Sequence, residues 1–159
     1  MAESSIYDDY FKYTDAASKK YGPKSVVLMQ VGAFYEMYGL KNGDSVVGSR
    51  VSDIASVCGG LAISEKKTVH SGFPVVMAGF RDYTLDRHAQ RIVESGYTAL
   101  VYDQQKQGTK FVRTLTSVLS AGTYLSNETT SMTNYIMCVW IDVFIKRNDK
   151  RNDKRRETY

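Results

Sequence analysis

The chain has 159 residues, of which 43% are hydrophobic and 24% are charged. This composition excludes a chain that is disordered throughout, and it predicts one globular domain with a core plus at most part of another. The apolar runs stay far below the roughly 18 residues that a membrane span needs, and the N-terminus is polar. We therefore expect an intracellular soluble protein without a membrane partner, in a compartment that the sequence does not specify.

The formal net charge of +4 comes from the C-terminus. Residues 146–159 contain seven Lys or Arg and three acidic residues, which leaves 14 basic and 14 acidic residues in positions 1–145. A neutral body gives no electrostatic reason for tight binding to a phosphate backbone. The tail repeats Lys-Arg-Asn-Asp, and we expect this basic low-complexity segment to be disordered.

The first predicted helix spans Tyr7–Tyr21, where apolar and aromatic residues recur every three or four positions. Ser4 or Ser5 is its expected cap, and Gly22-Pro23 ends it. The tyrosine-rich face could stack on nucleic-acid bases, but an aromatic stripe at helical spacing is more typical of a core.

The next stretch is an apolar strand, Val26–Val31, that stops at Gly32 and leads to an exposed tip. Because side chains alternate along a strand, Phe34, Glu36 and Tyr38 are expected on one face. An aromatic ring and a carboxylate on the same face are unusual in a core. They suit a wedge beside a hydrogen-bonding probe.

Turn residues and hydrophobic periodicity predict the remaining elements. We expect a turn at 41–44, a helix from Val47 to Cys58, and a hairpin or a strand with a charged loop at 61–69. Further on we expect a strand at 73–80, a helix from Asp82 or Thr84 to Glu94, and strands at 97–103 and 111–120 joined as a hairpin. Together they predict an α+β fold with one mixed β-sheet flanked by about three helices.

Neither the cysteines nor the other reactive residues indicate a catalytic or metal site. Cys58 and Cys138 lie far apart, and only His70 and His88 could join them as soft ligands. We expect two reduced, buried thiols, no metal and no catalytic residues.

The C-terminal part predicts a linker and an isolated strand. Residues 125–134 are rich in Ser, Thr and Asn, and the apolar segment 135–145 follows. An exposed strand of this kind promotes aggregation, so we expect it to pair with the sheet edge or with another copy.

Three blocks of the sequence resemble the N-terminal, mismatch-recognising domain (domain I) of the MutS DNA mismatch repair family. Gly32–Tyr38 resembles its Gly-x-Phe-Tyr-Glu motif, Phe73–Phe80 its Pro-Met-Ala-Gly-Val segment, and Arg113–Thr123 its closing Val-Thr-Pro-Gly-Thr. The order and spacing agree, and the likeness covers roughly residues 7–124. The chain also resembles the divergent branch of this family in giant viruses and octocoral mitochondria.

The sequence departs from the family pattern within the first and third blocks and just after the second. Ala33 stands where a charged or polar residue is usual, and the prolines expected near Arg81 and at Ala121 are missing. The pair of Phe34 and Glu36 is intact.

The resemblance implies a division of the chain and a DNA partner. Residues 1–124 would form the recognition domain, 125–134 the linker, 135–145 the first strand of a truncated connector domain, and 146–159 the basic tail. The expected partner is double-stranded DNA that contains mispairs or small loops.

The resemblance also implies roles for individual residues. Phe34 would enter the minor groove and stack on a mispaired or unpaired base, and Glu36 would hydrogen-bond that base. Inserted apolar side chains kink duplex DNA by ~20–90°, and unstacking costs least where pairing is already defective. Lys66 and Lys67 are candidates for contacts with the DNA backbone.

The ATPase of the full-length family, with its ATP and magnesium, is not expected in this chain, because no Gly-x-x-x-x-Gly-Lys-Ser/Thr loop is present. We therefore expect no enzyme and no cofactor here, and a dimer only if the missing domains are present. Two alternatives stay open. One is a non-specific single-stranded nucleic-acid binder that uses the tyrosines and the basic tail, and the other is a decayed structural or interaction domain.

Overall fold

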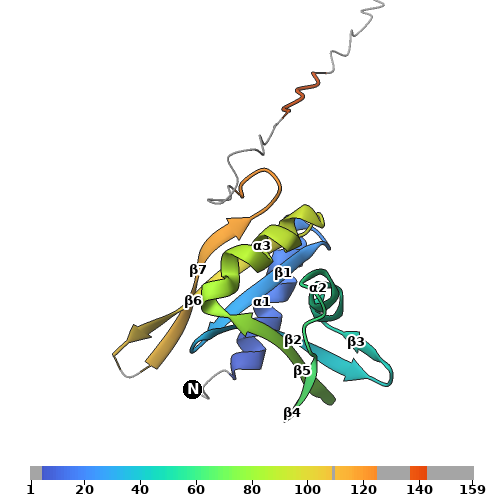
Figure 1. Cartoon of the computed structure of the whole chain (residues 1–159), viewed down its shortest axis with the longest axis vertical. Coiled ribbons are helices and arrows are strands. Elements are labelled where there is room, and N and C mark those ends of the chain that lie inside the picture. Colours follow the sequence, from blue (N-terminus) through green and yellow to red (C-terminus); the bar gives the residue numbers. More distant parts are fainter. Residues whose placement is uncertain (1–4, 109, 125–136, 143–159) are drawn as a thin grey trace, which may run out of the picture.

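The computed structural model describes residues 5–108, 110–124 and 137–142 (Figure 1). The helices are α1 (Ile6–Tyr21), α2 (Val51–Val57) and α3 (Leu85–Glu94), with a short 3₁₀ helix at Asp82–Thr84. The strands are β1 (Ser25–Val31), β2 (Phe34–Asn42), β3 (Ser45–Val47), β4 (Ser64–His70), β5 (Phe73–Arg81), β6 (Thr98–Gln107) and β7 (Lys110–Leu119).

These strands form one seven-stranded sheet in the order β4-β5-β2-β1-β6-β7, and β3 pairs with β2 outside this path. The pair of β1 and β6 is parallel and the other pairs are antiparallel, so the sheet is mixed. The predicted α+β fold, with one mixed sheet and three α-helices, is confirmed. The predicted strand at 26–31 is also confirmed, and as the central strand β1 it is buried along most of its length.

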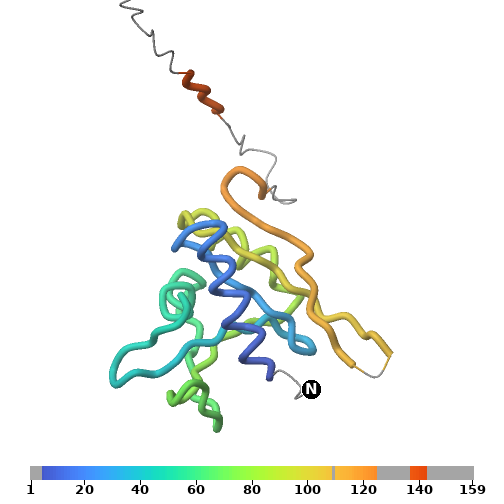
Figure 2. Tube along the Cα trace, turned by 180° about the vertical axis from the view of Figure 1, so that it is seen from behind, coloured from blue at the N-terminus to red at the C-terminus, as the bar shows by residue number. Residues whose placement is uncertain are grey.

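The helices cover the two faces of the sheet. Figure 1 shows α3 in front of the sheet, and Figure 2, from behind, shows α1 across the opposite face. Among the helices of the described ranges, none has the length and apolar character that crossing a membrane requires.

The helix α1 is fixed at its start and along its inner face. Ser5 and Asp8 form a reciprocal capping box, which satisfies backbone donors that the first turn would otherwise leave free. Tyr10 is fully buried, and its hydroxyl donates to the carbonyl of Val27 at 3.4 Å. This burial raises the pKa of Tyr10 to about 12. The tyrosine face of α1 is therefore part of the core, as its spacing predicted.

Several element boundaries differ from the prediction. The second helix begins at Val51 and not at Val47, because Ser45–Val47 turns back and pairs with β2. The hydroxyl of Thr84 donates to the carbonyl of Arg81 at 2.7 Å, and neither Asp82 nor Thr84 caps α3 through its side chain. The segment 61–69 contains neither a hairpin nor a charged loop: its charged residues lie within the single strand β4, at an irregularity in its register with β5.

The strand predicted at 135–145 is not formed over its described part. Residues 137–142 have no helix or strand and are exposed, and Cys138, which was expected to be buried, is exposed with them. A strand needs a hydrogen-bonded neighbour, and this segment pairs with no strand of the described sheet. The predicted linker at 125–134 and the predicted tail at 146–159 lie outside the described residues.

We predict that Gly39→Ala destabilises the fold. A Cβ at this position would lie 2.5 Å from a methyl carbon of Val46 and 2.7 Å from one of Val51. Overpacking of this kind costs typically about 1–3 kcal/mol, and valine has few rotamers with which to yield. Urea-induced unfolding of the full chain measures the loss.

The control for this prediction is Gly43→Asn. Gly43 has φ +61° and open space around it, and asparagine tolerates this left-handed conformation. Its unfolding midpoint should stay close to that of the parent. A Gly39→Ala protein as stable as the parent would show that the close packing of β2 against β3 and α2 is wrong.

Candidate functional site

The site begins at the hairpin turn between β1 and β2. Val31 pairs with Phe34, so only Gly32 and Ala33 form the turn. Gly32 has φ +60° at the first central position, where type II′ turns need glycine. A short turn of this type fixes the register of the hairpin and places Phe34 at the first position of β2.

The turn is held on both sides by hydrogen bonds to neighbouring segments. The N–H of Gly32 donates to the side-chain oxygen of Gln104 at 3.1 Å, and the N–H of Gln104 donates to that of Gln30 at 2.8 Å. On the other side, the N–H of Asp82 donates to the carbonyl of Ala33 at 3.0 Å. The side chains next to the turn therefore project from a fixed backbone.

Phe34 lies at this tip with 39% of its surface exposed, although the following residue and Met37 are buried in the core. Its cross-strand partner is Arg81, whose guanidinium carbon lies 4.7 Å from the centre of the Phe34 ring. This distance is that of a cation–π contact. The predicted exposure of the ring is confirmed, and its role on DNA stays a prediction.

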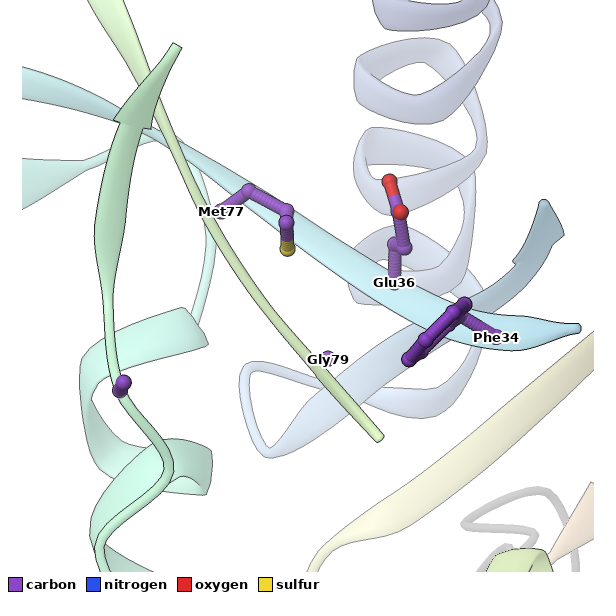
Figure 3. Close-up of a pocket in the computed structure, with 5 residues that line it drawn as sticks. Phe34, Glu36, Met77 and Gly79 are labelled. Atoms are coloured by element: carbon purple, nitrogen blue, oxygen red, sulfur yellow. The ribbon is translucent and has the colours of Figure 1, made fainter. Parts of the chain in front are cut away.

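An open pocket of about 290 Å³ lies beside Phe34 (Figure 3). Its other lining residues are Glu36, Ala62, Met77 and Gly79. Gly79 pairs with Glu36, and a Cβ on it would lie 2.8 Å from the carbonyl oxygen of Tyr35. Glycine is therefore required here, and its small size leaves room next to the carboxylate.

Glu36 is half-buried, and its carboxylate accepts a hydrogen bond from the hydroxyl of Tyr38. The rings of Tyr7 and Tyr10 both contact Tyr38 edge to face at 5.0 Å between centres. Burial, and after it the hydrogen bond to Glu36, raise the pKa of the Tyr38 hydroxyl. The hydroxyl thus stays protonated at neutral pH, and the carboxylate is the acceptor.

The opposite face of β2 is closed. The hydroxyl of Tyr35 donates to Asp103 at 2.6 Å, and its ring packs near that of Phe80. Phe80 in turn contacts His88 of α3 at 4.2 Å between ring centres. The predicted alternation along β2 is confirmed, because Phe34, Glu36 and Tyr38 share the face of α1.

The structure does not bring Lys66 and Lys67 next to Phe34. They lie on the edge strand β4 between two residues that pair with Val76 and Pro74. Val76 is five residues along β5 from Arg81, about 16 Å at the usual rise of a strand. Arg81 is the cation at the tip, and no sequence pattern predicted a role for it. The register between β2 and β5, which no local pattern reveals, is the signal that identifies it.

A second arginine lies on the other side of the turn. Arg113 lies on β7 and pairs with Gln104 of β6. Its Nε reaches past that strand and donates to the backbone carbonyl of Gln30 in β1 at 3.1 Å.

In the described part of the chain, no group of three His, Cys, Asp or Glu side chains comes together that could hold a metal ion. The site thus offers an aromatic ring, a carboxylate and two flanking cations.

Comparison with known proteins places this chain in a family. The profile of MutS domain I matches residues 12–128. The chain is 28% identical to a putative DNA mismatch repair MutS homologue of Acanthamoeba polyphaga mimivirus, over 87% of this chain and 12% of that protein.

Two bacterial proteins are also similar. The DNA mismatch repair protein MutS of Parabacteroides distasonis is 31% identical over 65% of this chain and 10% of its own length. That of Persephonella marina is 29% identical over 67% of this chain and 11% of its own length. The chain therefore spans only about a tenth of each of these relatives. The family match at residues 12–128 includes all the residues that line the pocket. It belongs to the MutS domain I family of DNA mismatch repair proteins.

Proposed function

We propose that this domain recognises mispaired or unpaired bases in duplex DNA, with Phe34 as the minor-groove wedge and Glu36 as the hydrogen-bond partner of the displaced base. The observation that carries the proposal is the position of Phe34. Its ring is exposed at the end of a hairpin held by hydrogen bonds on both sides, beside an open pocket that contains a carboxylate.

The physical basis is the cost of separating stacked bases. An aromatic ring inserted between base steps must unstack them, and a defective pair has less stacking and pairing to lose. Because the tip is fixed before DNA arrives, little conformational freedom is lost on insertion. Discrimination between sound and faulty duplexes then comes largely from how easily each duplex deforms.

Glu36 supports this selectivity by repulsion. A carboxylate that faces a regular duplex meets phosphates and groove acceptors, so close approach is unfavourable. A displaced base that offers an N–H group removes this penalty, because the carboxylate accepts its hydrogen bond. The same residue thus disfavours intact DNA and favours a base that has left its pair.

The flanking cations supply backbone contacts. Arg81 lies against the wedge, so it reaches the duplex wherever Phe34 does. Lys66 and Lys67, farther along the sheet edge, are proposed to contact phosphates a few base pairs away. With a neutral body and few such contacts, the chain alone should bind DNA weakly.

Among the described tyrosines only Tyr83 is exposed, so they do not provide the single-stranded alternative with a row of rings. Tyr10 is buried, and Tyr13 is stacked on Tyr102 at 4.4 Å between ring centres. A stacking platform needs exposed rings in a row. We therefore retain the duplex-binding proposal.

We predict that Phe34→Ala abolishes the preference for a duplex with one G·T mispair over the matched duplex. Stacking of a base on an aromatic ring contributes about 1–3 kcal/mol, which is about 5- to 140-fold in affinity. Fluorescence anisotropy at low salt, with each duplex labelled at one end, measures both dissociation constants.

The matched control for the wedge is Phe73→Ala. Phe73 is similarly exposed but begins β5 at the end of that strand opposite Arg81, so it should not affect the preference. If the parent and Phe34→Ala showed the same preference for the mispaired over the matched duplex, the role of Phe34 as a wedge would be contradicted.

We further predict that Arg81→Met weakens binding to matched and mispaired duplexes alike. One lost phosphate contact reduces the slope of log affinity against log salt by about 0.9. A titration series from low to moderate salt gives this slope. Lys20→Met, a charge loss near the far end of α1, should leave it unchanged, and an unchanged slope in Arg81→Met would exclude Arg81 from DNA contact.

A further inference from the structure

We infer that the outer parts of β6 and β7 form an arm that lies along the side of the duplex when the wedge is inserted, and that this arm contacts the phosphate backbone. The arm consists of residues 103–107 of β6 and 110–114 of β7, which pair with each other. This inference rests on the proposed function and deepens it, because it adds a DNA contact outside the pocket and predicts which part of the duplex is contacted.

The arm leaves the sheet at the level of the β1–β2 turn. Residues 25–29 of β1 pair with residues 98–102 of β6, whereas β6 and β7 stay paired with each other as far as Gln107 and Lys110. Figure 1 and Figure 2 both show these ends of β6 and β7 projecting away from the body of the domain. Because β1 and β6 are parallel, the arm points in the direction in which β1 runs towards the turn.

Hydrogen bonds tie the base of the arm to the turn that carries the wedge. Gln104 of the arm accepts a bond from the N–H of Gly32 at 3.1 Å and donates its own N–H to the Gln30 side chain at 2.8 Å. From β7, the Nε of Arg113 donates to the carbonyl of Gln30 at 3.1 Å. Both strands of the arm are therefore fixed to the turn, and the arm and Phe34 approach DNA as one unit.

The reach of the arm determines where it lies on DNA. Gln104 lies beside the turn, and three further residues of β6 extend beyond it, about 10 Å at the usual rise of a strand. β6 is also two strand positions away from β2, about 10 Å to the side. The minor groove is only about 7.5 Å deep and about 6 Å wide. With Phe34 in that groove, the arm cannot enter it as well, so it must pass beside the duplex along the backbone that borders the groove.

The charge of the arm suits this position. Residues 104–113 contain three basic residues and no acidic residue, whereas the rest of positions 1–145 holds 11 basic and 14 acidic residues. Lys106 and Lys110 are exposed towards the outer end of the arm, and Phe111, which pairs with Lys106, is 58% exposed. Lysine side chains bind phosphate oxygens without reading the base sequence. The arm is thus a local positive surface, and its position beside the groove brings it to the phosphates.

Removal of the two outer cations tests the arm. Lys106→Gln/Lys110→Gln should lose two phosphate contacts on a G·T duplex, which lowers the slope of log affinity against log salt by about 1.8. When the salt concentration rises fourfold, the parent should therefore lose about tenfold more affinity than this variant. Phe111→Ser removes no charge, so it should keep the slope of the parent. Fluorescence anisotropy with the full chain, at a series of salt concentrations, measures these slopes.

The matched control is Lys19→Gln/Lys20→Gln, which removes the same charge from the last turn of α1, near the start of β1 and far from the arm. Its slope should equal that of the parent. If Lys106→Gln/Lys110→Gln keeps the slope of the parent, or if the control lowers it equally, the inference is overturned while the wedge stands. If the parent does not distinguish the G·T duplex from the matched one, the proposed function fails, and a lower slope in Lys106→Gln/Lys110→Gln alone would still support the arm.

Discussion

The structure depends on the two-residue turn that joins β1 to β2. Its glycine allows the tight reversal, and two hydrogen bonds, one donated to the Gln104 side chain and one accepted from the N–H of Asp82, hold it against β6 and the end of β5. Without this turn, β2 would have no fixed register. Phe34 and Glu36 would then not occupy the face on which they meet Arg81, Gly79 and the open pocket.

The same strand serves the core and the candidate site. One face of β2 packs against α2, while its other face passes from the buried Tyr38 to the exposed Phe34 within five residues. The three tyrosines between α1 and the sheet connect these functions. They form part of the core, and one of them also holds the carboxylate that lines the pocket. The packing of α1 against Tyr38 therefore influences where the carboxylate of Glu36 lies.

Local sequence patterns predicted what depends on neighbours in the chain. Residue type and spacing predicted the strand at 26–31, the turn at Gly32 and the alternation after it. They also predicted the amphipathic helix α1. The motif around Phe34 and Glu36 was visible for the same reason. Longer-range features were not predicted. Arg81 and Gly79 lie beside β2 only because of the register between β2 and β5, two strands that are far apart in the sequence. The bond between Tyr38 and Glu36 joins two residues that the alternation had placed on one face, but their contact depends on burial by α1. Likewise, β3 replaced the start of the predicted second helix because pairing with β2 satisfies its backbone.

The central claim is that the Phe34 ring itself enters the duplex at a fault. The most direct measurement is the NMR signal of its ring protons, with the chain labelled selectively at phenylalanine and titrated with duplex DNA. The account predicts that the Phe34 resonances move upfield on addition of a G·T duplex, because a stacked base shields them, and that the matched duplex moves them little. If the Phe34 resonances stay in place while those of other phenylalanines shift, DNA binds elsewhere on the domain and the account is contradicted.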